Sequence, residues 1–138
     1  RGSHDEATGG NPASLRVIPG HVVKSWWQPF RHAMNGLRQS IREERHMKVH
    51  VIIGGIVLLV AFLLPLTAVE RAILFLTVGV VISAEMFNTA FERIVDLVTQ
   101  EWHPLAKAVK DIASGAVLVL ALTSVAIALC IFIPYLVQ

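Results

Sequence analysis

Long hydrophobic blocks fill most of the chain after residue 50. Residues 51–68 contain one polar side chain, Thr67, and residues 112–137 contain no charged one. Between them, residues 72–98 begin as apolar sequence and then acquire acidic side chains. A helix rises 1.5 Å per residue, so an 18-residue block spans about 27 Å, close to the thickness of a hydrocarbon core. Because backbone groups in lipid must bond internally, these blocks predict three membrane-spanning helices.

Ahead of the first block, aromatic and apolar residues recur near helical spacing, with basic residues between them. This pattern is typical of an amphipathic helix at a membrane interface, whose aromatic side lies among headgroups and whose basic side faces water and lipid phosphate. A plain basic flank is the alternative interpretation. The apolar positions are Trp26, Trp27, Phe30, Met34, Leu37 and Ile41, and the basic ones are Lys24, Arg31, Arg38, Arg42 and Arg45.

The predicted fold is therefore all-α and integral to the membrane. Residues 1–4 resemble the remnant of an expression tag, and the Gly- and Pro-rich stretch that follows to residue 20 predicts a mobile tail. Residues 21–138 are expected to form one membrane-embedded domain. In it we expect the interfacial helix at about 24–46 and spans at about 48–68, 70–99 and 108–137. The very short first link predicts an antiparallel hairpin.

Composition and charge agree with a membrane protein. Hydrophobic residues make up 54% of the chain and charged residues 16%, against about 25% charged in soluble domains. Of the 12 Lys and Arg residues, eight precede Val51, three lie from Arg93 to Lys110, and Arg71 occupies the hairpin turn. The positive-inside bias predicts a cytoplasmic N-terminus and an outward-facing C-terminus. The single cysteine, Cys130, excludes an intrachain disulfide.

The second span carries a polar stripe formed by Glu85, Asn88, Glu92 and Asp96. At about 100° per residue these positions fall on one narrow helix face. Ionisable residues inside a membrane are expensive and usually face a bundle interior or a wet cavity, so a functional role is the first hypothesis. A structural polar seam between helices is the alternative. Several acids on one face favour binding of a cation.

Two further charged sites are expected at the same membrane face. Glu43 and Glu44 end the interfacial helix, and Lys110 and Asp111 precede the third span. Oxygen ligands suit Mg²⁺, which usually arrives with phosphates. The combination indicates phosphoryl transfer at the inner face. The sequence has no Walker loop and no nucleic-acid-binding motif, so a P-loop kinase is excluded.

Three segments resemble the prokaryotic diacylglycerol kinase and undecaprenol kinase family. They are the run from Glu85 to Asp96, the run from Lys110 to Val117, and Gly36-Leu37-Arg38 followed by Glu44-Arg45. The similarity covers about residues 30–134, with the motifs in the family's order. It implies that residues 21–138 are a lipid kinase domain, and that three-span subunits form a homotrimer in a bacterial inner membrane. It also implies active sites shared between neighbours, and Mg²⁺-dependent transfer of the ATP γ-phosphate to a membrane lipid alcohol.

The resemblance also implies roles for individual residues. Glu85 matches the general base, and Glu44 and Glu92 match the metal ligands. The positions expected near the nucleotide are Lys110, Asp111, Glu101, His103, Asn88, Asp96 and His32, and those expected near the lipid are Arg38 and Ser114.

The chain departs from the family pattern at three positions. The family often has Ala where this chain has Val109, many undecaprenol kinases have Asn at His46, and some members have Tyr at His32. These departures affect the expected nucleotide contacts and leave the expected base and metal positions unchanged.

The segment Leu105-Ala106-Lys107-Ala108 resembles the undecaprenol kinase branch, so undecaprenol is the favoured substrate. Diacylglycerol is the alternative lipid. A non-catalytic assembly, such as a small cation channel lined by the acidic stripe, is the alternative from a different class.

Overall fold

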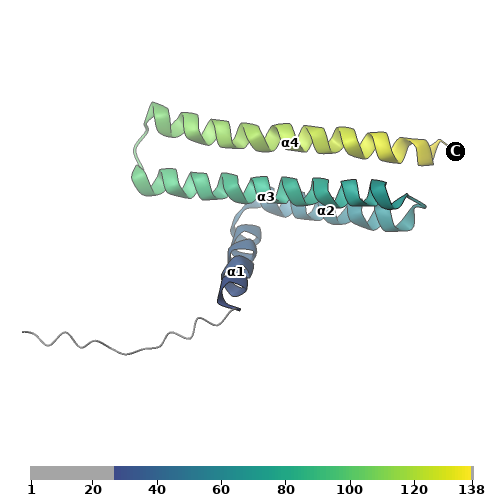
Figure 1. Ribbon diagram of the computed structural model, residues 1–138. Helices are drawn as coiled ribbons and strands as arrows, with labels where there is room; N and C mark the ends of the chain where they lie inside the picture. Colours follow the sequence, from purple (N-terminus) through teal and green to yellow (C-terminus); the bar gives the residue numbers. More distant parts are fainter. Residues whose placement is uncertain (1–26, 138) are drawn as a thin grey trace, which may run out of the picture.

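The computed structural model describes residues 27–137, and this part of the chain is helical with no strand. It contains α1 (Gln28–Glu43), α2 (Arg45–Leu63), α3 (Ala68–Val98) and α4 (Pro104–Leu136). The last three helices run side by side, and α1 projects from them at a steep angle (Figure 1). Each of α2, α3 and α4 is long and apolar enough to cross a membrane. The predicted all-α architecture with three spans is confirmed.

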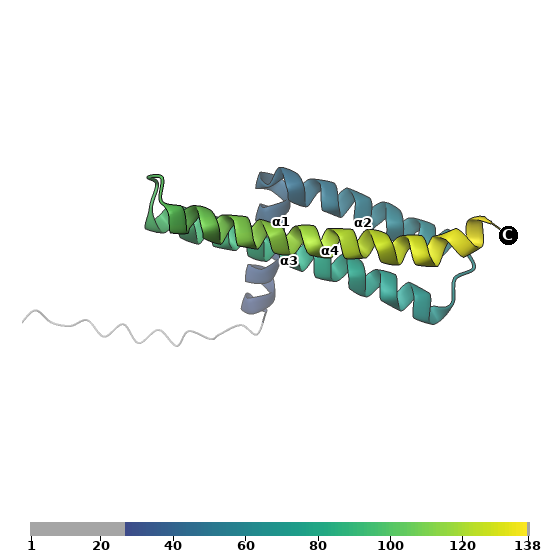
Figure 2. The same cartoon turned by 90° about the horizontal axis from the view of Figure 1, so that it is seen from above.

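The three long helices differ in length, and this difference positions the site. The 19 residues of α2 rise about 28 Å, whereas the 31 residues of α3 and the 33 of α4 rise about 46 and 50 Å. At the hairpin end, the α2–α3 turn lies beside the C-terminus of α4. At the opposite end, called the loop end, α3 and α4 continue past the start of α2 to their own connection (Figure 2). Several turns of α3 and α4 therefore extend beyond α2.

Local sequence explains where the helices end. Glu44 has an extended backbone (φ −97°, ψ 124°), which breaks the helical run between α1 and α2. The helix α2 ends at Leu63 rather than near 68, because Pro65 disfavours the helical conformation of the residue before it. Thr67 and Glu70 form a reciprocal capping box at the start of α3. The helix α4 begins at Pro104 rather than near 108, since proline suits the first helical position.

The buried core lies at the hairpin end. Ala61, Leu66, Leu74 and Ile131 pack together there. Arg71 donates to the carbonyl oxygens of Ala61 and Leu64, at 3.2 and 3.3 Å. These two bonds satisfy carbonyls that the end of α2 leaves without a helical partner. The hairpin is thus closed by packing and by hydrogen bonds together.

A second link at this end joins α3 to α4. Tyr135 donates from its hydroxyl to Glu70 Oε2 at 2.8 Å, across 65 positions of sequence. The same carboxylate oxygen accepts from the backbone and the hydroxyl of Thr67. The two long helices are consequently tied together next to the hairpin.

Most large apolar side chains on the long helices remain exposed in the single chain. Ile52 is 62% exposed, Leu76 69% and Leu122 62%. A water-soluble monomer rarely leaves so continuous an apolar surface uncovered. Lipid or further protein must cover these faces.

The helices α2 and α3 approach each other closely at Gly54. A Cβ atom placed on Gly54 would lie 2.7 Å from Val78 Cγ1, closer than side-chain atoms normally come. The absence of a side chain therefore allows α2 to pack directly on α3. This contact lies one helical turn from His50, which faces the candidate site.

Candidate functional site

A groove of about 610 Å³ opens between α2, α3 and α4 on the loop side of the Gly54 contact. We call it the carboxylate groove. Three of the four predicted stripe residues line it, and Asp111 and Ser114 join them from α4. The complete lining is His46, His50, Glu85, Asn88, Glu92, Asp111, Ser114, Gly115, Val117 and Leu118.

Glu85 is the buried acid of this groove, with 4% of its surface exposed. Its Oε1 lies 3.0 Å from Nε2 of His50 on α2. A carboxyl group held out of water is costly unless it is paired. His50 supplies that pairing, and the remaining exposure of Glu85 opens onto the groove.

Asn88 and Glu92 form a second polar contact along the same face of α3. Asn88 Nδ2 donates to Glu92 Oε1 at 3.2 Å, and Ser114 Oγ on α4 donates to Asn88 Oδ1 at 3.4 Å. Asn88 therefore connects the Glu92 carboxylate to α4. The three side chains hold oxygen atoms along one wall of the groove.

A second groove of about 400 Å³ lies at the loop end, and we call it the loop groove. Lys110 Nζ donates to Asp96 Oδ1 at 2.6 Å, joining α4 to α3. Asp111 pairs with Lys107 on the same helix and lines both grooves. The predicted nucleotide positions Asp96, Glu101, His103, Lys110 and Asp111 all line the loop groove.

His103 also has a structural role in the loop. Its Nδ1 accepts a hydrogen bond from the backbone N–H of Leu105 at 3.2 Å, which caps the start of α4. The cap leaves Nε2 as the ring nitrogen that can contact a ligand. Glu101 is exposed beside it.

Glu44 lies at the break between α1 and α2, outside both grooves. Arg93 on α3 contacts it at 3.8 Å and forms a closer ion pair with Glu43, at 2.7 Å. Arg93 follows Glu92 directly in the sequence. Both predicted metal ligands therefore lie near the same turn of α3, but one groove does not contain them both.

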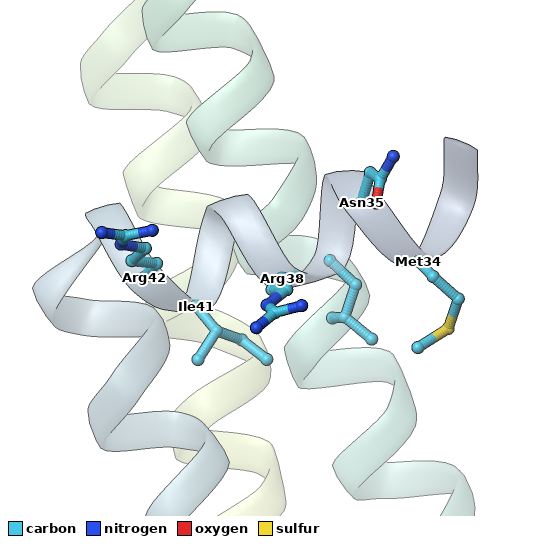
Figure 3. Close-up of a pocket in the computed structure, with 6 residues that line it drawn as sticks. Met34, Asn35, Arg38, Ile41 and Arg42 are labelled. Carbon is cyan, nitrogen blue, oxygen red and sulfur yellow. The ribbon is translucent and has the colours of Figure 1, made fainter. Parts of the chain in front are cut away.

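Arg38 and His32 lie on α1, away from both grooves. Arg38 lines a separate hollow on this helix with Met34 and Ile41, and Figure 3 shows these three side chains on one side of α1. His32 is exposed. In the single chain, the predicted lipid-contacting residues Arg38 and Ser114 are therefore not brought together.

A family model described as prokaryotic diacylglycerol kinase matches residues 31–132 of this chain. The chain belongs to the prokaryotic diacylglycerol kinase family. The family resemblance of the three sequence motifs is confirmed. This member of the family is a lipid kinase with membrane-spanning helices.

Named relatives include kinases of two lipid alcohols. The chain is 44% identical over 112 residues to the undecaprenol kinase of Bacillus subtilis (strain 168), covering 81% of this chain and 91% of that protein. It is 40% identical over 131 residues to a diacylglycerol kinase of Synechocystis sp., covering 89% and 75%. The diacylglycerol kinase of Escherichia coli (strain K12) is 29% identical over 94 residues, covering 68% and 77%.

The oxygen atoms in this kinase's carboxylate groove fit a metal ion that arrives with a nucleotide. Within residues 27–137, no three His, Cys, Asp or Glu side chains are grouped so that they could hold a metal by themselves. Mg²⁺ needs fewer protein ligands than such a group would supply, because it keeps several waters and is held by one or two carboxylates plus substrate phosphates. Glu92 and the Asn88 amide oxygen, with Asp111 across the groove, are donors of that type.

Sequence reasoning gave no role in the site to two histidines of the kinase that line the carboxylate groove. His46 and His50 are four residues apart, so they lie on the same face of α2. Their spacing was a usable signal, but nothing in the sequence fixed the rotation of α2 relative to α3. The close approach at Gly54 supplies that rotation.

Proposed function

We propose that the protein transfers the γ-phosphate of ATP to undecaprenol, giving undecaprenyl phosphate. The observation that carries this proposal is the placement of Glu85. It is buried in a groove at the start of α2, while five of the seven predicted nucleotide positions line a second groove further along α3 and α4. Asp111 belongs to both grooves. A lipid hydroxyl and a nucleotide phosphate could therefore meet between them.

Glu85 is the proposed general base. The lipid hydroxyl oxygen forms a bond to the γ-phosphorus as the bond from that phosphorus to the β-phosphate oxygen breaks, and ADP leaves with the electron pair. The hydroxyl proton passes to the Glu85 carboxylate. An alcohol is a weak nucleophile while it keeps its proton, so a positioned base accelerates its attack. Burial among helices holds this base in place.

The proposed contacts to Mg-ATP come from both grooves, from α1 and from the break between α1 and α2. Glu92 and Glu44 are the proposed protein ligands of Mg²⁺, and Asn88 orients Glu92. Mg²⁺ held there would neutralise phosphate charge, and phosphoryl transfer depends mainly on such stabilisation together with positioning. Lys110 is the proposed phosphate contact. The remaining nucleotide contacts that we propose are Asp111, Asp96, Glu101, His103 and His32.

The unequal helix lengths support a lipid site at the carboxylate groove and a nucleotide site at the loop groove. A 28 Å helix such as α2 matches a hydrocarbon core of about 30 Å, whereas the loop-end turns of α3 and α4 extend beyond it. Glu85 would then lie near the membrane surface, where a lipid hydroxyl resides, and Lys110 would lie in water. We propose that the loop end and the N-terminus face the cytoplasm, as the basic residues predict.

We further propose a homotrimer in the bacterial inner membrane with sites shared between chains. The uncovered apolar faces of the long helices support association with other copies. The positions of Glu44, Arg38 and His32 outside both grooves also support it. In a composite site, these residues act on the grooves of a neighbouring chain. We place α1 at the membrane interface, where its apolar side would shelter the lipid entrance.

Undecaprenol is the proposed alcohol because the chain is 44% identical to an undecaprenol kinase over most of both proteins. Diacylglycerol is the second candidate, favoured by the 40% identity to a diacylglycerol kinase. Their chemistry at the reacting hydroxyl is the same, so the assignment of Glu85 does not depend on this choice.

A competition assay tests the proposal. Purified protein in mixed micelles receives Mg-ATP with undecaprenol and diacylglycerol in equal amounts, and the phosphorylated lipids are separated. We expect undecaprenyl phosphate to form faster. A preference for diacylglycerol would make diacylglycerol the assigned substrate and leave the proposed phosphoryl transfer unchanged. Phosphorylation of neither alcohol would contradict the kinase function and favour a non-catalytic role such as a small cation channel.

A further inference from the structure

The contact between His50 and Glu85 crosses from one helix to another. His50 lies in the second turn of α2, and Glu85 lies in the middle of α3. The nitrogen Nε2 and the oxygen Oε1 are 3.0 Å apart. The side chains are 22% and 5% exposed, so water competes little for either group. Both residues line the carboxylate groove.

We propose that His50 is a positioning residue for the catalytic carboxylate of Glu85. The inference rests on the proposed role of Glu85 as the general base. An ionised carboxylate can only accept hydrogen bonds, so a ring nitrogen 3.0 Å away must carry a proton for the contact to be attractive. In this contact Nε2 of His50 would be the donor, and Oε1 of Glu85 the acceptor.

This bond selects which carboxylate oxygen performs the chemistry. With Oε1 held by His50, Oε2 is left to face the groove and accept the proton of the lipid alcohol. Among residues 27–137, Ser40 Oγ is the buried side-chain polar atom without a hydrogen-bond partner, and neither carboxylate oxygen of Glu85 is in that class. The accessible direction of Oε2 is the groove that Glu85 lines.

The surrounding packing fixes the ring that makes this bond. Gly54 follows His50 by one turn and brings α2 against Val78 on α3. The two helices are therefore held at a separation that an imidazole bridges. A misplacement of about 1 Å at a reacting group can lower a rate by about a hundredfold, so such a support affects turnover directly.

Substitutions at residue 50 that differ in reach test the proposal. His50→Ala removes the donor, His50→Asn keeps an amide on a shorter side chain, and His50→Gln places an amide nitrogen near the position of Nε2. We expect kcat with undecaprenol to fall about a hundredfold in His50→Ala and His50→Asn, and His50→Gln to recover most of the loss. KM for Mg-ATP should stay unchanged in all three.

Two further variants complete the experiment. Val49→Ala is the matched control, because Val49 is the preceding residue of α2, 46% of its surface is exposed, and it lies outside both grooves. It should keep wild-type turnover. His50→Ala is also combined with Glu85→Gln. If His50 acts through Glu85, the double variant should turn over no more slowly than Glu85→Gln alone.

The outcomes distinguish the positioning role of His50 from the general-base role of Glu85. Normal kcat in His50→Asn, or equal losses in His50→Asn and His50→Gln, would overturn the positioning role. If His50→Ala fails to fold, this comparison of Asn with Gln still decides the question. Normal turnover in Glu85→Gln would instead overturn the base assignment, whatever the substitutions at residue 50 do.

Discussion

Lys110 on α4 donates a hydrogen bond from Nζ to Oδ1 of Asp96 on α3, at a distance of 2.6 Å. The two residues are 14 positions apart, on opposite sides of the α3–α4 connection. The pair aims an ammonium group at the loop groove and joins the two helices where they extend beyond α2. Lys110 is 38% exposed, so a phosphate can reach it without dismantling the bundle.

Replacing Lys110 should weaken nucleotide binding. Lys110→Ala removes a cation from the loop groove, and a hydrogen bond to a charged group contributes about 1.5–3 kcal/mol, which corresponds to an increase of about ten- to hundredfold in KM for Mg-ATP. Steady-state kinetics at varied Mg-ATP measures this. Lys48→Ala is the control, because Lys48 is an exposed lysine on α2 that lies outside both grooves.

Lys107 would be a poor control for this measurement. It lines the loop groove itself and pairs with Asp111, which lines both grooves. An unchanged KM for Mg-ATP in Lys110→Ala would mean that Lys110 only pairs with Asp96 and does not contact the nucleotide.

Glu85→Gln should abolish most turnover and leave nucleotide binding intact. Glutamine has nearly the same shape as glutamate but cannot accept the proton of the alcohol, and general base catalysis contributes about a hundred- to ten-thousandfold. The loss should appear in kcat, while the affinity for Mg-ATP measured by titration stays unchanged. Near-normal turnover in folded Glu85→Gln protein would mean that Glu85 is only a buried structural acid.

Glu92→Gln and Glu44→Gln should each raise the Mg²⁺ concentration needed for half-maximal activity. An amide keeps the size of the side chain but is a weaker ligand for a hard cation than a carboxylate. Titration of Mg²⁺ at fixed ATP measures the shift, and EDTA should stop turnover in every variant.

Glu43→Gln is the informative comparison for Glu44. Glu43 forms the closer ion pair with Arg93, at 2.7 Å against 3.8 Å for Glu44. We expect Glu43→Gln to leave the Mg²⁺ requirement unchanged. A shift in Glu43→Gln without one in Glu44→Gln would reassign the metal ligand to Glu43.

Gly54→Ala should destabilise the protein and slow catalysis. The new Cβ would lie 2.7 Å from Val78 Cγ1, and a β-branched side chain has little freedom to move away. Overpacking of this kind costs about 1–3 kcal/mol. It should also separate α2 from α3 near His50, so kcat falls with stability. Thermal unfolding in detergent and the kinase assay measure the two effects.

Gly55→Ala is the matched control for that substitution. Nothing lies within 4 Å of a Cβ placed on Gly55. Alanine favours a helix over glycine by about 1 kcal/mol, so this change should leave stability equal or higher. Equal losses in the two variants would show that helix flexibility, rather than close packing, accounts for the effect at Gly54.

Hydrophobic pattern was sufficient to predict the spans, because membrane insertion depends on length and apolar content. It did not place their ends. The end of α2 depends on Pro65, and the start of α4 depends on Pro104 with the His103 cap. These local backbone effects set the helix ends at positions that the hydropathy of the sequence does not mark.

The candidate site was predictable on one helix and not between helices. Helical periodicity placed Glu85, Asn88 and Glu92 on one face of α3, and they line one groove. Asp96 lies on the same stripe but pairs with Lys110 at the loop groove. His50 was missed because its contact with Glu85 depends on how α2 rotates against α3. The rotation of α2 relative to α3 cannot be predicted from a single sequence.

The short α2 has a consequence for the bilayer around the protein. Its 19 residues span about 28 Å, which is slightly less than a membrane core of about 30 Å. Because α1 turns away at Glu44, α2 cannot extend when the membrane is thicker. The bilayer must thin around the protein or flanking polar side chains must snorkel to the interface, and either response shifts the depth of Glu85 relative to the lipid hydroxyl. Acyl-chain length of the surrounding lipid thus becomes a variable of the reaction itself.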